Sequence, residues 1–152
     1  MKKTILILFT ILISIPSFSQ IKRIKDNSVI IGKVQHISCT KNENTYTITY
    51  NDHKFTQIDD FKSFSLSEED FNDIFDIIIQ GFSDIPKEDI KLETPNDVLI
   101  LKFSKSMGIV SLNIYHLVNK NAEIVGLTRY LTKKQVLKLF GKKKKKEKRK
   151  KK

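Results

Sequence analysis

The longest apolar run of the chain lies close to its N-terminus. Thr4–Ile15 is almost entirely hydrophobic, follows Lys2 and Lys3, and ends at Pro16. Small serines then stand three and one positions before Gln20. A basic start, an apolar run and small residues in this order are typical of a secretory signal peptide. We therefore expect residues 1–19 to be removed and the mature chain to begin at residue 20.

A retained membrane anchor is the alternative interpretation of this run. A membrane-spanning helix needs about 20 apolar residues, whereas Thr4–Ile15 is shorter and is followed by a proline. No later stretch is apolar for long enough to span a bilayer. The pattern favours export, to the periplasm or to the outside of a bacterial cell, with no transmembrane segment after cleavage.

Hydrophobic and polar residues then alternate with a period of two, which predicts strands. The clearest case is Thr45–Tyr50, where Tyr46, Ile48 and Tyr50 should face the core while the threonines face water. Ile21–Ser28 is basic and polar and predicts an irregular lead-in or an edge strand. The strands expected in this half are Val29–Cys39, Thr45–Tyr50, Phe55–Ile58 and Phe61–Leu66.

Helical spacing of apolar residues follows these strands. Phe71, Ile74, Phe75, Ile78 and Phe82 recur every three or four residues and predict one apolar stripe along a helix. Ser67 precedes three acidic residues, as expected for a capping hydroxyl at the positive end of a helix dipole. We expect Gly81 to end the helix.

The second half repeats the order of strands and then a helix. Asp84–Asn96 holds two prolines and predicts a connecting loop, and three strands follow: Val98–Phe103, Ile109–Val118 and Glu123–Tyr130. Thr132 and Gln135 have the spacing of a capping box, so a last helix should begin there, bury Val136, Leu139 and Phe140, and end at Gly141.

These elements predict an α+β fold. We expect an antiparallel sheet of about five to six strands with two helices, one after each group of strands, packed on one face. The single domain would cover residues 20–141. Leu66-Ser67-x-x-Asp70-Phe71 matches Leu131-Thr132-x-x-Gln135-Val136, which suggests a weak βββα repeat. Because the match is little more than a capping box, the unrepeated α+β domain is favoured.

The net charge of +11 belongs mostly to one end of the chain. Of 28 basic residues, ten lie in residues 142–152 and two are Lys2 and Lys3, which leaves sixteen in residues 20–141 against sixteen acidic ones. The expected domain is therefore neutral, and the polybasic tail after it, which we expect to be disordered, carries the charge. A basic DNA-binding surface does not follow from the composition, and export argues against a genomic target.

Candidate chemistry is sparse. The chain lacks glycine-rich phosphate loops, paired-histidine helices, nucleophile elbows and calcium loops, and it predicts no cofactor and no metal. A hydrolase-like site would have to be assembled from distant positions, namely His116, His53 and Asp59 or Asp60. His116 falls on the apolar face of its strand, where a histidine is more often a hydrogen-bonded core residue.

Three other features have an ordinary and a functional interpretation. The acidic stretch from Asp59 to Asp76 could hold a hard cation, but its order does not match a ligand loop, and a solvated face is favoured. Thr45, Thr47 and Thr49 form a hydroxyl row that could bind a sugar or another ordered polar surface, although threonine is common on exposed strands. Cys39, the only cysteine, is expected to be buried, and a reactive thiol or intermolecular disulfide is the alternative.

One feature breaks a local rule. Lys133 and Lys134 occupy the first turn of the last helix, where the dipole disfavours cations. We therefore expect this helix and the polybasic tail to form one contact with an anionic surface: lipid phosphates, a charged polysaccharide or extracellular nucleic acid. An envelope protein is a further candidate partner. A solubilising tail without a target is the alternative. The contact residues would be Arg129, Lys133, Lys134, Lys138, Lys142, Lys143, Lys144, Lys145, Lys146, Lys148, Arg149, Lys150, Lys151 and Lys152.

The sequence thus predicts a small exported protein that acts as a non-catalytic binding or structural module of the cell envelope. The alternative is the hydrolase-like enzyme described above.

Overall fold

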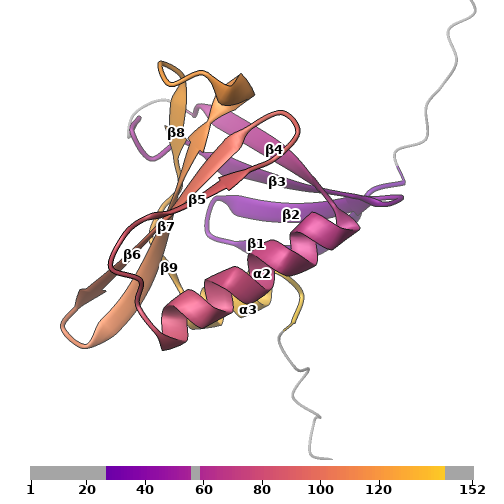
Figure 1. The fold of residues 1–152 in the computed structure, drawn as a ribbon. Coiled ribbons are helices and arrows are strands. Elements are labelled where there is room, and N and C mark those ends of the chain that lie inside the picture. Colours follow the sequence, from indigo (N-terminus) through magenta and orange to yellow (C-terminus); the bar gives the residue numbers. More distant parts are fainter. Residues whose placement is uncertain (1–26, 56–58, 143–152) are drawn as a thin grey trace, which may run out of the picture.

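Two antiparallel sheets and two helices make up the fold (Figure 1). The computed structural model describes residues 27–55 and 59–142. The expected signal peptide, the lead-in before Asn27, residues 56–58 and the tail after Lys142 lie outside the described residues. The predicted α+β class is confirmed, but the prediction of one sheet of five to six strands is wrong. Four strands form one sheet and five form the other.

The first sheet has the order β1-β2-β3-β4. Its strands are β1 (Val29–Val34), β2 (Ile37–Asn42), β3 (Thr45–Asn51) and β4 (Phe61–Ser67). The predicted strand Val29–Cys39 is in fact two strands, because a tight turn at Gln35 and His36 reverses the chain. The expected alternation in β3 is confirmed, since Tyr46, Ile48 and Tyr50 are buried. Phe55 belongs to no strand.

Helix α2 (Glu68–Ser83) begins where the sequence predicts it. The Ser67 hydroxyl accepts a hydrogen bond from the Asp70 backbone N–H at 3.1 Å, and the predicted apolar stripe packs into the core. Gly81 does not end the helix, which is a correction. A Cβ at Gly81 would collide with the Phe103 ring, so this glycine lets the second sheet approach the helix closely.

The second sheet has the order β5-β6-β7-β8, and β9 pairs with β7. Its strands are β5 (Ile90–Glu93), β6 (Val98–Ser106), β7 (Ile109–Leu117), β8 (Val125–Leu127) and β9 (Leu131–Thr132), with the short 3-10 helix η1 (Val118–Lys120) after β7. Strand β5 lies inside the predicted loop, and the predicted strand Glu123–Tyr130 is reduced to β8. The two halves contain four and five strands, so a βββα unit does not describe either.

Helix α3 (Lys133–Leu139) starts with the predicted capping box, in which Gln135 Oε1 accepts from the Thr132 backbone N–H at 2.8 Å. Val136, Leu139 and Phe140 are buried, as predicted. The helix follows the second sheet in sequence but packs mainly against β1 and β2 of the first. A Cβ at Gly32 would collide with the carbonyl groups of Lys138 and Leu139, so the close approach requires glycine there.

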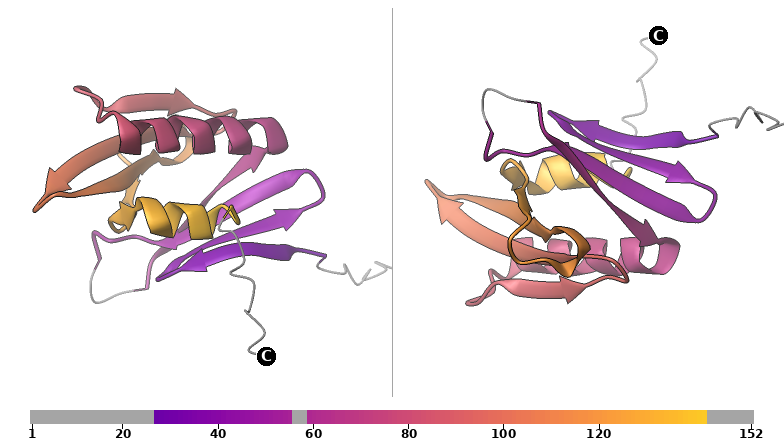
Figure 2. Two further views of the ribbon diagram at one scale, coloured as in Figure 1. Left: turned by 90° about the horizontal axis from the view of Figure 1, so that it is seen from below. Right: turned by 90° about the horizontal axis from the view of Figure 1, so that it is seen from above.

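The core lies between the inner faces of the sheets and the helices. Tyr46 stacks on Phe71 with ring centroids 3.9 Å apart, and Phe71 stacks on Phe140 at 4.7 Å, which joins β3, α2 and the C-terminal end of α3. Cys39 is fully buried, as predicted, and burial raises the pKa of its thiol to about 11. Both helices lie on the inner side of the first sheet, so its other face looks away from the core (Figure 2).

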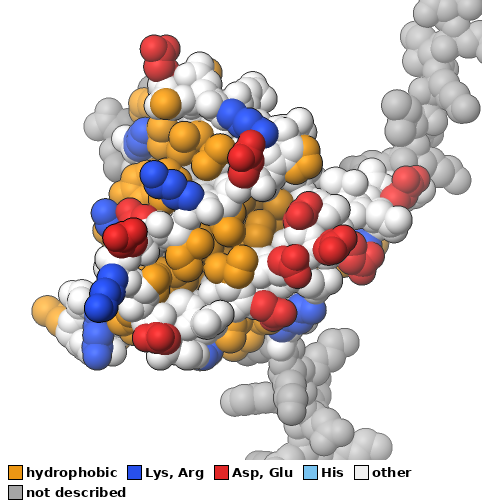
Figure 3. Space-filling model, viewed as in Figure 1, with side chains coloured by type: hydrophobic (Ala, Val, Ile, Leu, Met, Phe, Trp, Pro, Cys, Tyr) orange, Lys and Arg blue, Asp and Glu red, His pale blue; other side chains and the backbone are white. Residues whose placement is uncertain are grey.

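Among the described residues, no helix has the length and apolar character needed to cross a membrane. Acidic side chains gather along α2 on the face shown in Figure 3, and hydrophobic side chains lie between α2 and β5. Ile77, Gly81, Pro86 and Ile90 border a shallow hollow of about 230 Å³ in that region.

Candidate functional site

The predicted anionic-contact residues begin just before α3 and continue past its end. The described members, all exposed, are Arg129, Lys133, Lys134, Lys138 and Lys142. The remaining members lie outside the described residues: Lys143, Lys144, Lys145, Lys146, Lys148, Arg149, Lys150, Lys151 and Lys152. No acidic residue occurs in residues 124–146. This segment of the chain therefore carries positive charge without an acidic residue close to it in sequence.

Two of these ammonium groups have neutral partners. Lys133 Nζ donates to Ser83 Oγ at 3.3 Å. Lys142 Nζ donates to Asn72 Oδ1 at 3.2 Å and lies 5.6 Å from the centre of the Phe75 ring. Within residues 27–55 and 59–142, none of the five basic residues forms an ion pair. These five charges are therefore not held in direct ion pairs by the described residues.

Two of the three lysines on α3 oppose the dipole of their own helix, whereas Lys138 lies in its last turn, where a cation is favourable. Lys133 and Lys134 lie in its first turn, which contains no acidic residue. Each cation at this end of a helix dipole costs about 0.3–1 kcal/mol at low salt. The capping box and the burial of Val136 and Leu139 hold the helix in place instead. Because the helix dipole disfavours both lysines and only Lys133 has a hydrogen bond within the fold, to Ser83, their position calls for another explanation.

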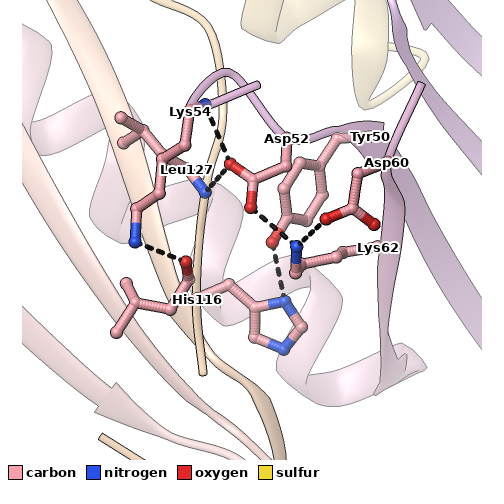
Figure 4. Close-up of polar contacts among 8 residues, drawn as sticks. Tyr50, Asp52, Lys54, Asp60, Lys62, His116 and Leu127 are labelled. Atoms are coloured by element: carbon pink, nitrogen blue, oxygen red, sulfur yellow. Dashed lines mark hydrogen bonds and ion pairs between the residues drawn. The ribbon is translucent and has the colours of Figure 1, made fainter. Parts of the chain in front are cut away.

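A buried polar cluster joins the two sheets far from α3 (Figure 4). A hydrogen bond of 2.9 Å connects Tyr50 Oη on β3 to His116 Nδ1 on β7, and both side chains are fully buried. His116 Nε2 lies 3.1 Å from Asp97 Oδ1, but no hydrogen bond joins the two atoms. Asp97 Oδ1 accepts from the Asn119 backbone N–H at 2.9 Å. A Cβ at Gly126 would collide with the Tyr50 hydroxyl, so glycine is required beside it.

The Asp52 carboxylate forms the second part of this cluster. Asp52 Oδ2 accepts from Lys62 Nζ at 2.7 Å, and Oδ1 accepts from the backbone N–H groups of Lys54 and Leu127, each at 3.1 Å (Figure 4). Lys62 also pairs with Asp60. Since Asp52 follows β3 and Leu127 belongs to β8, this one carboxylate ties the first sheet to the second.

The protonation of these groups follows from their contacts. Burial alone would raise the pKa of Asp52, but the hydrogen bonds from Lys62 and the two backbone N–H groups hold it below its ordinary value. For Lys62, burial acts to lower the pKa, and the two aspartates outweigh it and raise the pKa. Burial, with the nearby carboxylates, also raises the pKa of Tyr50. The cluster is thus an ion pair at neutral pH, beside a neutral phenol.

The residues of the hydrolase-like alternative lie in this region, but their contacts are with different partners and do not bring their side chains together. His116 has no exposed surface, so a substrate cannot reach its ring in this conformation. Asp60 pairs with Lys62, and Asp59 Oδ1 accepts from Asn51 Nδ2 at 2.8 Å. The backbone N–H of His53 donates to the Leu127 carbonyl at 2.8 Å, and that contact is structural. The arrangement favours a role in joining the sheets over a role in catalysis.

Acidic residues of the stretch from Asp59 to Asp76 likewise contact different partners. Glu68 pairs with Lys41, and Asp70 binds the capping Ser67. In the described part of the chain, no group of three or more His, Cys, Asp and Glu residues could hold a metal ion.

The sequence pattern did not reveal the partners in the buried cluster. Tyr50 and His116 are 66 positions apart, and Asp52 and Leu127 are 75 apart. One local sign was present, because Lys62 shares the inward phase of β4 with Phe64 and Leu66. A lysine in that phase needs a buried carboxylate.

Comparison of the chain with models of protein families, with curated proteins and with solved structures finds no match. The functional argument therefore depends on the chain's own residues.

Proposed function

We propose that the protein is a small exported module of the cell envelope that acts without catalysis and holds to anionic lipid surfaces through α3 and the polybasic tail. The observation that carries the proposal is the set of exposed basic residues from Arg129 to Lys142, which have no ion pair in the described part of the chain. Nine more basic residues follow directly in sequence.

The energetics rank the two parts of the contact. A basic residue close to an anionic membrane contributes about 1 kcal/mol. The described cations alone would then supply at most about 5 kcal/mol, which corresponds to a sub-millimolar dissociation constant. The tail carries nine further basic residues on the same end of the molecule, so it would supply the larger part of the attraction, and the cations from Arg129 to Lys142 would strengthen it.

The body of the protein supports a module rather than an enzyme. In its described core, Asp52 is paired with Lys62, Tyr50 is hydrogen-bonded to His116, and the His116 side chain is enclosed. In this account the body supplies a stable fold that carries α3, and the charge contact localises it.

Vesicle flotation tests the proposal. The full chain is compared with a variant in which the ten basic residues of residues 142–152 are replaced by Ser and Gln. We expect the full chain to float with phosphatidylglycerol-containing vesicles at low salt, to be released at high salt, and to be absent from phosphatidylcholine vesicles. The tail variant should lose most of this retention. A heparin column run in parallel distinguishes a lipid partner from a polysaccharide partner. Stronger retention on heparin than on the vesicles would assign the contact to a polysaccharide. Equal retention of the two proteins would contradict the proposal.

A further inference from the structure

The outer face of the first sheet consists largely of hydroxyl side chains in register. Ser38, Thr49 and Ser63 are paired across β2, β3 and β4, and so are Thr40, Thr47 and Ser65. All six point away from the buried phase of their strands and are at least partly exposed. Adjacent strands lie about 4.8 Å apart, and rows two residues apart are separated by about 6.7 Å. The result is a regular array of hydroxyl groups, which we call the hydroxyl face.

A hollow of about 160 Å³ adjoins this array. Gln35 and His36 of the β1–β2 turn, Ser38, Thr49 and Phe61 contribute to its lining. Phe61 has the same strand phase as Ser63 and Ser65, and 59% of it is exposed. An aromatic ring therefore lies beside donors and acceptors of three kinds, namely hydroxyl, amide and imidazole groups.

The charge of this surface is unusual for the chain. Charged residues make up 30% of the sequence, yet the hydroxyl face and the hollow contain a single lysine or carboxylate, Lys33. A strongly basic partner would find no carboxylate among these residues, and an acidic partner would find only Lys33. The surface complements an uncharged partner that is rich in hydrogen-bonding groups.

Sugar polymers have this chemistry. The C–H face of a sugar ring can pack on an aromatic ring, and each sugar hydroxyl both donates and accepts, as serine and threonine hydroxyls do. Threonine side chains on strands are already restricted at χ1, so little conformational entropy is lost when they bind. Both helices pack on the opposite side of the sheet, so neither of them covers this face (Figure 2).

We propose that the hydroxyl face binds an uncharged polysaccharide, with one sugar ring stacked on Phe61 in the hollow and neighbouring sugars on the serine and threonine rows. This site is separate from the basic residues of α3 and goes beyond the proposed attachment to anionic lipid. It would give the protein a second contact, one that does not depend on charge.

The test measures retention of the full chain on cellulose and on chitin in 1 M NaCl, where the Debye length is about 3 Å and the tail is screened. Phe61→Ala removes the stacking ring, and Thr49→Val removes one hydroxyl while keeping the branched shape. Tyr130→Ala is the matched control, because Tyr130 is another aromatic residue with 59% exposure. Thermal melting of each variant shows whether it is folded.

We expect the full chain to bind at least one of the two polymers and a soluble oligosaccharide of that polymer to release it. Phe61→Ala should weaken retention about tenfold, equivalent to about 1.4 kcal/mol, Thr49→Val should weaken it less, and Tyr130→Ala should leave it unchanged. Absence of binding to both polymers would overturn the proposal, as would binding that survives both substitutions on the face. If the protein binds neither polymer but self-associates, and Phe61→Ala abolishes the self-association, the face would instead be assigned to contact with a second copy of the chain. Because the assay is run at high salt, its outcome does not depend on the anionic contact.

Discussion

The pair between Lys62 and Asp52 offers a direct test of how the two sheets are held together. Replacing Lys62 by Met keeps the length of the side chain but removes the ammonium group that lies 2.7 Å from Asp52 Oδ2. The Asp52 side chain has no exposed surface, whereas that of Lys62 is 16% exposed. The substitution therefore leaves a buried carboxylate without its cation.

The expected cost can be bounded from these contacts. Breaking a buried pair by removing one partner costs about 3–5 kcal/mol. Asp52 keeps two backbone N–H donors, from Lys54 and Leu127, so we expect Lys62→Met to lower the free energy of unfolding by about 3 kcal/mol, at the lower end of this range. Adding Asp52→Asn should restore part of the loss, since the amide removes the uncompensated charge.

Equilibrium unfolding in urea at neutral pH measures these differences. Lys41→Met is the matched control, because Lys41 pairs with Glu68 in a more exposed setting and should lose only about 0–1 kcal/mol. An effect of Lys62→Met no larger than that of the control would refute the reasoning, as would a double variant that is less stable than Lys62→Met alone.

Three further predictions concern pH, packing and capping. The pKa of Asp52 in the folded protein lies below its ordinary value of 3.8. The stability that Asp52 contributes is therefore present above pH 3.8 and is lost as the pH falls through the folded-state pKa. The free energy of unfolding of Asp52→Asn should accordingly depend less on pH in acid. Gly32→Ala should lower the melting temperature markedly, since its Cβ would collide with the end of α3; an unchanged melting temperature would contradict this. Ser67→Ala should cost about 1 kcal/mol in urea unfolding, because the Asp70 N–H loses its cap; a neutral result would mean that the cap does not matter here.

The elements that the sequence predicts well depend on local contacts. Both helix starts follow from side chains within three positions of the cap, and the alternation in β3 follows from burial of one face. The division into two sheets depends on long-range pairing and was not predictable in the same way. Strand β5 has only four residues and lies between two prolines, so its pattern resembles a loop.

The turn between β1 and β2 shows a second reason for failure. Gln35 adopts a φ of 51°, a left-handed conformation in which glycine is usual. Without glycine or an Asn-Gly pair at this point, the sequence gives no sign of a hairpin, and β1 and β2 were expected to be one strand.

The candidate sites differ in the same respect, because some depend on residues close in sequence and others on long-range strand pairing. The basic residues from Arg129 to Lys142 are visible in the sequence because they lie within one short segment next to the polybasic tail, and because the helix dipole disfavours Lys133 and Lys134. The cluster around Asp52 and His116 becomes visible only when strands from the two halves meet. The hydroxyl face is intermediate, since one row on β3 was apparent while its extension to β2 and β4 required the strand register.

The central claim is that α3 takes part in binding to anionic lipid. The most direct test measures how well a variant floats with anionic vesicles when it keeps the tail but carries Gln at Arg129, Lys133, Lys134 and Lys138. The matched control carries Gln at four other exposed lysines: Lys87, Lys91, Lys102 and Lys105. The account predicts that the α3 variant binds the vesicles at least about tenfold more weakly than the control, because each cation near the membrane contributes about 1 kcal/mol. It also predicts no loss of folding stability, because the two lysines at the helix start oppose the helix dipole. Equal binding of the two variants would show that α3 is not part of the contact and would contradict the account.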